Sequence, residues 1–496
     1  MNALLVYPEI PDTFWSFKHA LRFIRKKAAS PPLGLITIAG MLPPAWSKRL
    51  VDLNVTNLSD EDLKWADIAL ISAMTVQRES TNQVIQQFNE ANIRIVAGGP
   101  LFTVEPDSYD AVDHLVLNEA ELTLPPFIED LNHNQARSMY TSTVFPDLGE
   151  TPLPRWELLD LDRYATMNVQ FSRGCPFNCE FCNVTSLFGH RPRTKSADQM
   201  IVELDSLYRL GWRGGVFFVD DNFIGHKRIL KDALLPALIE WRKDKRGLPF
   251  TTEASINLAD DEELIRLMVE AGFSSVFVGI ETPDEQSLAE CSKKQNLNRD
   301  LVADVKKIQR AGLQVQGGFI VGFDSDTASI FQQQIDFIQK SAIVTAMVGL
   351  LQAPPGTGLY KRLKEAGRLV TRMSGDNVDG TTNIIPLMNM DTLRHGYKQI
   401  LEHIYSPGAY YQRIQSFLRE YQPPKVKMPI DFSFMMEHLL ALLRSIYWLG
   451  ILGKERVHYW KLLFWTLFRK PRLLPQAVTL AIYGYHFRKV CESHVL

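Results

Sequence analysis

Short apolar runs alternate with amphipathic stretches through the first 130 residues of the chain. Apolar runs at 4–7, 49–52, 68–71, 93–96 and 114–117 predict strands, and helical periodicity at 33–42 and 81–91 predicts helices. This alternation is typical of a doubly wound, Rossmann-like parallel sheet. Ligands of such sheets bind at the carboxyl ends of the strands. We therefore expect an α/β domain over residues 1–145 with a ligand site at that edge.

A second α/β unit is expected after residues 146–166, which are proline-containing, lack periodic apolar positions and predict an extended linker. Apolar runs at 168–171, 216–219, 250–253, 275–280, 316–321 and 348–351 predict six more strands, separated by amphipathic helices such as 261–271 and 300–311. Six βα repeats within 167–360 predict a partial (βα)6 TIM-type barrel rather than a closed eight-stranded one. The pattern at 361–496 is mainly helical and predicts a C-terminal helical domain.

Composition narrows the class of protein. The chain has 496 residues and a formal net charge of -2, which is not the basic balance of a dedicated nucleic-acid binder. We expect no nucleic-acid partner. The N-terminus has no signal-peptide pattern, and no run reaches the roughly 18 apolar residues that a spanning helix needs, so we expect a cytoplasmic protein.

Three of the five cysteines lie within eight residues, in the pattern C-x3-C-x2-C formed by Cys175, Cys179 and Cys182. Three thiolates suit a soft metal centre. One candidate is structural zinc with His190 as a fourth ligand, and the other is a 4Fe-4S cluster with one open iron. An odd, clustered set of cysteines does not suit a disulfide framework, and we expect Cys291 and Cys491 to be inert thiols.

This cysteine motif, with Phe181 before its last cysteine and a position after the first barrel strand, resembles the radical S-adenosylmethionine (SAM) superfamily. The resemblance implies that SAM chelates the open iron and is cleaved to a 5'-deoxyadenosyl radical. The motifs at 219–223, 278–283, 318–323 and 352–357 also resemble SAM-contacting segments of that family. The SAM-binding residues that it implies are Phe181, Asp220, Asp221, Asn222, Glu253, Glu281, Gly322 and Gln352. Judged from the residues alone, Asp220 and Asp221 could instead cap a helix, and Gly322 could be a packing glycine.

A doubly wound domain before such a barrel resembles the cobalamin-binding domain of the cobalamin-dependent branch of this superfamily. The cobalamin-binding residues that the resemblance implies are Ser72, Met74, Thr75, Val76, Gln77, Gly98, Gly99, Pro100 and Glu119. The chain lacks the Asp-x-His-x-x-Gly motif that places a histidine on cobalt, so the resemblance implies a cobalt with no histidine below it, facing residues 74–77. The alternative is a degenerate domain that serves only as a lid.

Residues 13–20, the Pro31–Gly34 segment and the C-terminal extension with residues 484–487 resemble a subgroup that includes the hopanoid C-2 methylases. This implies a methyltransferase that uses two SAM molecules per turnover and transfers a methyl group to an unactivated carbon through the radical and methylcobalamin. The implied partners are a small, hydrophobic, lipid- or hopanoid-like substrate and an electron donor such as flavodoxin or ferredoxin. The alternatives are a cobalamin-dependent cyclase or rearrangement enzyme, a non-catalytic corrinoid-binding protein, and a cluster-bearing RNA-modifying enzyme.

The tail differs in charge from the rest of the chain. Residues 431–496 hold nine Lys or Arg against four Asp or Glu, and aromatic and apolar residues recur there at helical spacing. Such helices suit peripheral contact with the inner, anionic face of a membrane. A helical cap packed on the barrel explains the same pattern equally well.

Overall fold

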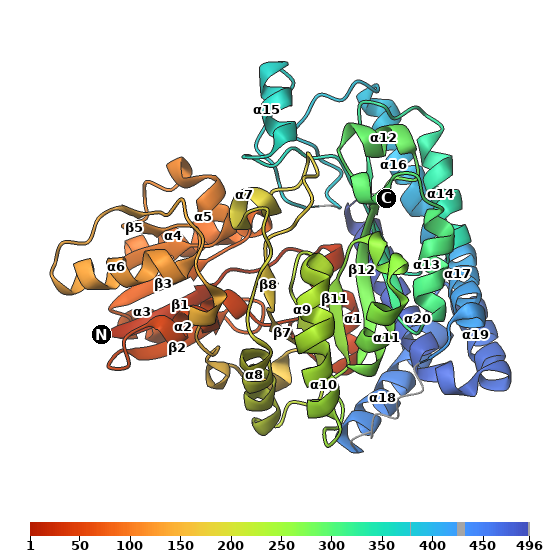
Figure 1. Cartoon of the computed structure of the whole chain (residues 1–496), viewed down its shortest axis with the longest axis horizontal. Coiled ribbons are helices and arrows are strands. Elements are labelled where there is room, and N and C mark those ends of the chain that lie inside the picture. Colours follow the sequence, from red (N-terminus) through yellow and green to blue (C-terminus); the bar gives the residue numbers. More distant parts are fainter. Residues whose placement is uncertain (377, 424–431, 495–496) are drawn as a thin grey trace.

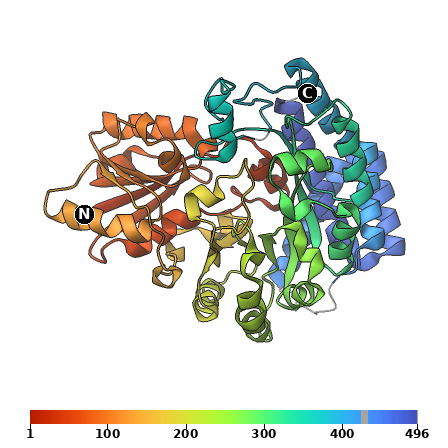
Figure 2. The ribbon, with the colours of Figure 1, turned by 45° about the horizontal axis from the view of Figure 1, so that its top comes forward.

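The computed structural model describes residues 1–376, 378–423 and 432–494. It contains two large parallel sheets and a group of C-terminal helices (Figures 1 and 2). The N-terminal sheet lies at one end of the molecule, the second sheet lies in the middle, and the C-terminal helices pack beside it. The parts of the expected helical domain at 424–431 and 495–496 lie outside the described residues.

The N-terminal sheet has six parallel strands in the order β2-β1-β3-β4-β5-β6. Its strands are β1 (Asn2–Tyr7), β2 (Ser47–Asp52), β3 (Ile68–Ser72), β4 (Arg94–Gly98), β5 (His114–Val116) and β6 (Met139–Tyr140). The helices between them are α2 (Leu33–Met41), α3 (Asp60–Trp65), α4 (Arg78–Glu90), α5 (Pro100–Val104) and α6 (Ala120–Asn132). In β1, Leu4 and Val6 pack on one face of the sheet while Ala3 and Leu5 pack on the other. Burial of both faces explains the continuous apolar runs, and the doubly wound prediction is confirmed.

The carboxyl ends of these strands face the barrel. Strand β1 begins at the outer end of the domain, where the N-terminus lies, and runs toward the barrel (Figure 1). The strand order reverses between β1 and β3, and ligands of doubly wound sheets bind at such a reversal. Gln77 Nε2 donates to the Pro8 carbonyl oxygen at 2.6 Å, which joins the segments that follow these two strands.

Residues 14–29 leave the N-terminal sheet and pack on the barrel. They include the 3-10 helix η1 (Phe14–Ser16) and helix α1 (Lys18–Ile24), and Phe14 and Phe23 belong to the barrel's hydrophobic core. The N–H of Thr166 donates to the Ala29 carbonyl oxygen at 2.9 Å, which ties this segment to the first barrel strand. These residues fall within the predicted 1–145 domain, because a sequence pattern does not reveal that a connection crosses into a neighbouring unit.

The second sheet is a partial barrel of six parallel strands in the order β14-β13-β12-β11-β10-β7, with β7 and β14 as its edges. Its strands are β7 (Thr166–Val169), β10 (Gly215–Phe218), β11 (Phe250–Glu253), β12 (Phe273–Glu281), β13 (Gln314–Val321) and β14 (Ala346–Leu350). Its helices are α8 (Ala197–Arg209), α9 (Lys227–Ile229), α10 (Leu235–Arg242), α11 (Glu262–Glu270), α12 (Glu285–Glu290), α13 (Leu301–Arg310), α14 (Ile330–Ser341) and α15 (Gly358–Glu365). Each expected barrel strand is present within a few residues of its predicted position.

The C-terminal helices cover the barrel from two directions. They are α16 (Met390–Ile404), α17 (Pro407–Glu420), α18 (Phe432–Ser445), the π-helical turn η11 (Ile446–Ile451), α19 (Arg456–Arg469) and α20 (Leu474–His494). Helix α16 packs on α14, and both α18 and α20 pack on α1. Among the described residues, none of the helices combines the length and apolarity required to cross a bilayer.

Candidate active site

The three clustered cysteines lie on a loop after β7, between two short antiparallel strands, β8 (Ser172–Arg173) and β9 (Arg193–Thr194). The turn into the loop requires glycine. Gly174 has a φ of +95°, and a Cβ there would lie 2.9 Å from the Gly189 carbonyl oxygen. The N–H of Cys175 donates to that same oxygen at 3.3 Å, so the loop is closed by its own backbone.

The cysteine sulfurs fit an iron-sulfur cluster better than a single metal ion. All three are free thiols, and burial raises the pKa of Cys182 to about 12 and also raises that of Cys175. Among the described residues, no group of three ligand atoms within 4.8 Å of one another includes them, although thiolates around one tetrahedral zinc lie closer than that. His190, the fourth ligand of the zinc alternative, is exposed. Spacing and chemistry therefore suit a larger centre.

Side-chain amides approach two of the sulfurs. Gln295 Nε2 lies 3.6 Å from Cys179 Sγ, and Asn222 Nδ2 lies 3.8 Å from Cys175 Sγ. Such N–H···S contacts are one means by which a protein adjusts the potential of an iron-sulfur cluster. The cysteine loop thus already has polar groups arranged around it.

A partly exposed ion-pair network holds the cysteine loop against the carboxyl end of the barrel strands. Arg362 of α15 binds both carboxylate oxygens of Glu180, at 2.8 and 2.9 Å, and also contacts Asp324 after β13 at 3.0 Å. The N–H of Glu180 donates to the Cys291 carbonyl oxygen at 2.9 Å. Cys291 itself lies in a small apolar cluster with Phe323, so its thiol faces a hydrophobic core.

Asp220, expected to contact SAM, braces the backbone before the cysteine loop. Its carboxylate accepts hydrogen bonds from the N–H groups of Phe171 and Ser172 and from the Ser172 hydroxyl, at 2.5–3.1 Å. It is fully buried, and burial raises its pKa to about 7. Asn222 accepts from the N–H and hydroxyl of Ser255 after β11 while it points Nδ2 at Cys175. Both side chains position the loop.

Glu253, Asp221 and Glu281 bring three carboxylates to the carboxyl ends of β10, β11 and β12. Burial raises the pKa of Glu253 to about 8, and the charges of Asp221 and Asp220 raise it further. Glu281 has a φ of +63° and pairs with the buried Lys293 at 2.7 Å. The Glu253 side chain makes no hydrogen bond to another described residue, and the charges of Asp221, Asp220 and Glu281 act on it.

The other three residues expected at the SAM site, Phe181, Gly322 and Gln352, have different neighbours. Phe181 packs edge-on to Phe323, with Lys293 Nζ 6.0 Å from its ring centre. Gly322 has a φ of +107°, and its N–H donates to Asp326 at the end of β13. Gln352 Nε2 donates to the Ser374 hydroxyl and to the carbonyl oxygens of Asp376 and Thr381, with the Asp376 bond at 2.8 Å.

An ion-pair network joins the two α/β units. Glu119, expected to contact cobalamin, is buried after β5 and binds Arg173 of β8 at 2.6 Å and Arg193 of β9 at 2.7 Å. Arg173 also pairs with Glu121, and the Thr151 hydroxyl donates to that carboxylate at 2.8 Å. The hairpin that carries the cysteine loop is therefore fastened to the carboxyl edge of the N-terminal sheet.

The predicted cobalamin-binding loops gather at that same edge. Gln77 accepts from the N–H of Met74 at 2.8 Å, and the Met74 side chain is 41% exposed. Gly99 has a φ of +88°, and a Cβ there would lie 2.6 Å from Ser72 Oγ, so only glycine fits. The other members also lie at these strand ends: Gly98 ends β4, Pro100 begins α5, and Thr75 and Val76 follow β3, where a Cβ at Gly375 would lie within 3.1 Å of both. The bare Gly-Gly backbone and exposed Met74 would admit a large, flat ligand.

Several site residues could not be chosen from the sequence. Lys293 and Gln295 follow α12 and approach the cysteine loop only because β12 ends beside it. Arg173 directly precedes Gly174 and the cysteine motif, and a charged residue at that position is a sequence signal for an ion pair. Its partner Glu119 is 54 residues away in sequence.

Comparisons with known proteins agree with this geometry. The Radical SAM superfamily pattern matches residues 169–338, and a domain of unknown function, DUF4070, matches residues 357–495. An uncharacterized methyltransferase of Synechocystis sp. is 41% identical over 497 residues, covering 99% of this chain and 92% of the relative. Hopanoid C-2 methylase of Rhodopseudomonas palustris is 34% identical, covering 94% of this chain and 89% of the relative.

Two solved structures share the fold across the chain. The cobalamin-dependent SAM radical enzyme OxsB, with aqua-cobalamin and SAM bound, aligns with a TM-score of 0.63 at 12% identity, covering 99% of this chain and 80% of that one. The radical SAM methyltransferase TsrM from Kitasatospora setae, with cobalamin and a [4Fe-4S] cluster bound, aligns with a TM-score of 0.62 at 14% identity, covering 99% of both chains.

Residues 169–338 belong to the radical SAM superfamily, and the whole chain shares its fold with cobalamin-dependent members of that superfamily. The chain belongs to the methyltransferase family that includes hopanoid C-2 methylase. The predicted fold class and enzyme class are confirmed, and the radical SAM match agrees with the predicted 4Fe-4S cluster and SAM. Both solved structures that share the fold hold cobalamin, the third predicted cofactor. The domain boundaries and the cofactor-binding residues stay predictions.

Proposed function

We propose that this protein transfers a methyl group to an unactivated carbon of a hydrophobic, hopanoid-like lipid. The observation that carries the proposal is the ion-pair network of Glu119 with Arg173 and Arg193. It holds the cysteine hairpin at the edge of the N-terminal sheet where a corrin would bind. A radical source and a methyl carrier would then share one space.

Within that space, we assign the cluster to Cys175, Cys179 and Cys182, and the charged end of SAM to Glu253 and Asp221. The cluster would supply the electron that cleaves SAM, and the cobalamin would supply the methyl group. The corrin would lie against the Met74–Gln77 loop and the Gly98–Gly99 backbone. Phe181, Asn222, Glu281 and Gly322 would line or position the SAM site. The buried position of Asp220 and the contacts of Gln352 favour bracing roles for these two.

A radical mechanism suits the chemistry of such a substrate. No side chain has a pKa that would let it deprotonate an unactivated carbon, so acid-base catalysis is not available for this step. The residues of this chain would instead bind SAM, orient the substrate and exclude water. An electron donor such as flavodoxin or ferredoxin would reduce the cluster.

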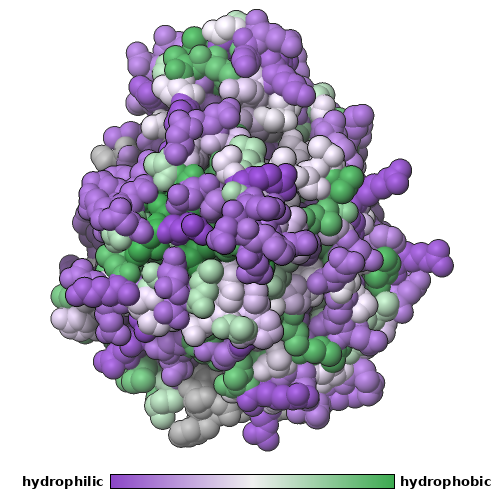
Figure 3. All heavy atoms as spheres, turned by 90° about the vertical axis from the view of Figure 1, so that its left-hand side faces the viewer, coloured by the Kyte–Doolittle hydropathy of each residue, from purple (hydrophilic) through white to green (hydrophobic). Residues whose placement is uncertain are grey.

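Support for a hydrophobic substrate comes from the hopanoid C-2 methylase relative and from the surface of the tail. Large apolar side chains are exposed on α18, η11 and α19: Leu440, Leu443, Tyr447, Trp448, Ile451, Leu452, Val457, Phe464, Leu467 and Phe468. The face on the N-terminal domain's side, in contrast, is largely hydrophilic with small separate hydrophobic areas (Figure 3). We therefore propose that the tail both caps the barrel and contacts a membrane surface peripherally.

The proposal is tested by comparing the lipid profiles of a deletion strain and its parent, followed by anaerobic assay of the reconstituted enzyme. We expect loss of a methylated polycyclic lipid in the strain. In the assay, deoxyadenosine and S-adenosylhomocysteine should form in step with product. Deoxyadenosine without S-adenosylhomocysteine would favour a cyclase or rearrangement enzyme. Cobalamin binding without a reconstituted cluster would favour a corrinoid-binding protein.

A further inference from the structure

A cavity of about 850 Å³ opens inside the barrel at the end where the strands begin. It lies opposite the cysteine loop, because it is lined by the first residues of β7 and β10, Thr166 and Gly215, and by early residues of β11 and β12, Thr251 and Ser275. Its volume is in the range of pockets that hold molecules of drug size or larger.

Small side chains on the inner face of the sheet keep the cavity open. Barrels of this type normally fill their interior with layers of bulky Val, Ile and Leu side chains. Here the lining positions near the starts of β7, β10, β11 and β12 carry threonine, glycine and serine, while Phe217, Phe277 and Gln316 of β13 are larger lining side chains. An empty barrel interior forgoes packing, so its presence favours a bound ligand.

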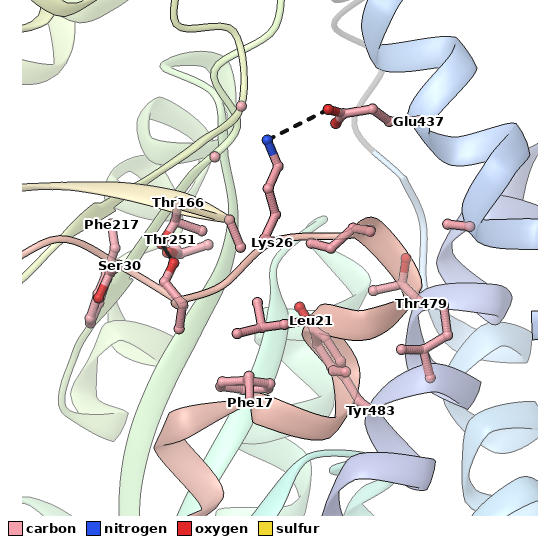
Figure 4. A pocket seen from close by; sticks show the side chains of 18 of the residues that line it. Phe17, Leu21, Lys26, Ser30, Thr166, Phe217, Thr251, Glu437, Thr479 and Tyr483 are labelled. Atoms are coloured by element: carbon pink, nitrogen blue, oxygen red, sulfur yellow. Dashed lines mark hydrogen bonds and ion pairs between the residues drawn. The ribbon is translucent and has the colours of Figure 1, made fainter. Parts of the chain in front are cut away.

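The remaining wall comes from the two ends of the chain. Phe17, Leu21 and Ile24 from the α1 region line the cavity together with Leu442 of α18 and Tyr483 of α20, and the rings of Phe17 and Tyr483 lie 5.1 Å apart. Figure 4 shows Phe17, Leu21 and Tyr483 grouped on one side and Thr166, Phe217 and Thr251 on the other. The walls formed by the helices are mainly apolar, and the barrel wall contributes hydroxyl groups.

An ion pair lies at the edge of the cavity. Lys26 Nζ is 3.6 Å from Glu437 Oε1 (Figure 4). This ion pair joins the segment after α1 to helix α18. The Glu437 side chain is 52% exposed, so this edge reaches solvent. Leu439, also on α18, lines the cavity and is 49% exposed. The edge at α18 therefore combines solvent access with apolar side chains.

The inner end of the cavity reaches the candidate active site. Phe277 lines the cavity and pairs in register with Glu253, the carboxylate whose charge we assign to SAM binding. Thr251 lines the cavity two residues before Glu253 on the same strand and the same face, a separation of roughly 7 Å. Trp15 also lines the cavity at this level and packs on Phe277 with ring centres 4.9 Å apart.

We propose that this cavity holds the hydrocarbon body of the substrate, with the carbon to be methylated directed up the barrel toward Glu253 and the cysteine loop. The inference rests on the proposed function and adds the binding site and its substrate class, a bulky polycyclic hydrocarbon. The substrate enters at the edge formed by α1 and α18. DUF4070, which includes α18 and α20, supplies one wall of the site.

The first test locates the ligand without any need for turnover. The reconstituted full-length protein is irradiated with a pentacyclic triterpene that carries a diazirine, and the labelled peptides are identified by mass spectrometry. We expect labels in α1, α18 and α20, and competition by the unlabelled triterpene. Labels confined to the exposed apolar surface of α19, or to the N-terminal sheet, would overturn the proposal.

The second test blocks the cavity with matched tryptophan variants on one helix. Leu442 lines the cavity, whereas its neighbour Leu443 points outward and is 54% exposed. Leu442→Trp should weaken binding of the tritiated triterpene by about tenfold or more, because a larger side chain would compete for the same volume. Leu443→Trp should leave binding within about twofold of the parent protein, as expected for a surface change.

Two measurements keep this test separate from the proposed function. Deoxyadenosine release without substrate should be equal in both variants, which shows that the SAM site is intact. If Leu442→Trp binds and methylates lipid as well as Leu443→Trp, the cavity assignment is overturned while the methyltransferase proposal stands. If the triterpene binds in the cavity but is never methylated, the proposed substrate reaction fails instead.

Discussion

The two ends of the barrel are built from opposite kinds of contact. At the carboxyl ends of the strands, charged side chains are tied in pairs, as in Glu180 with Arg362 and Glu281 with Lys293. At the amino ends, small and apolar side chains surround about 850 Å³ of open space. Cofactors with fixed charges and reactive atoms require one defined geometry, and ion pairs supply it. A hydrocarbon body requires volume and apolar walls.

Different parts of the chain also surround the two ends of the barrel. The N-terminal sheet contacts the charged end through Glu119, whereas α1, α18 and α20 close the apolar end. On helix α20, Tyr483 lines the cavity, and His486 stacks on Phe17, which also lines it. Changes at the two ends should therefore have different effects on cofactor binding and on substrate binding.

The largest effect is expected from loss of one cluster cysteine. Cys182→Ala should abolish the brown absorption of the reconstituted cluster and all deoxyadenosine formation, because two thiolates cannot hold the cluster. The matched control is Cys291→Ala, whose thiol lies in an apolar core near the loop. Iron and sulfide content are measured in both. A full cluster in Cys182→Ala, or none in Cys291→Ala, would contradict the assignment.

Next in size is the network between the two α/β units. Glu119→Ala should lower the free energy of unfolding by about 3 kcal/mol or more, because it leaves the Arg173 and Arg193 charges largely buried without their shared partner. Denaturant titration measures the loss. The control is Glu157→Ala, which removes an exposed pair with Arg155 and should cost less than about 1 kcal/mol. Equal losses of unfolding free energy in the two variants would show that the Glu119 network stabilises the fold no more than an exposed ion pair does.

The apolar end predicts a pH effect from His486. Burial lowers its pKa to about 4, so between about pH 6.5 and pH 4 the unfolded chain binds a proton that the folded chain does not. Stability should therefore fall as the pH falls through this window, by up to about 3 kcal/mol in total.

His486→Gln should flatten that part of the curve of unfolding free energy against pH. Asp12 and His19 face the same ring and remain in the variant. The exposed His190→Gln serves as the control and should leave the slope unchanged. An equally steep curve in His486→Gln would assign the acid sensitivity to other groups.

The smallest predicted effect concerns two glycines, Gly279 with close neighbours and Gly34 with open space around it. A Cβ at Gly279 would lie 2.3 Å from Glu281 Oε1 and 2.8 Å from Lys293 Nζ. Gly279→Ala should therefore disturb that ion pair, cost about 1–3 kcal/mol and weaken SAM binding. Gly34→Ala, in a helix with nothing within 4 Å of the new Cβ, should be neutral or stabilising by up to about 1 kcal/mol. Calorimetry with and without SAM measures both.

Prediction from sequence was most successful where the signal is local. Strand β11 has the predicted bounds, and the other barrel strands differ by a few residues, because apolar runs report burial directly. The cysteine spacing likewise carries its chemistry within eight residues. Local signals do not reveal contacts between residues far apart in sequence. The SAM contact expected of Asp220 stays a prediction, and its bonds to Phe171 and Ser172, 49 and 48 residues away, appear only in the structure.

The sequence by itself determined two α/β units, a cysteine loop after the first barrel strand and a helical, basic tail. Periodicity and spacing record such features because they depend on neighbours in the chain. Only the tertiary structure decided that Glu119 fastens the cysteine hairpin to the N-terminal sheet, and that Leu21 and Tyr483 share a cavity wall. Contacts of this kind join residues far apart in sequence, and their geometry exists only after the whole barrel has closed.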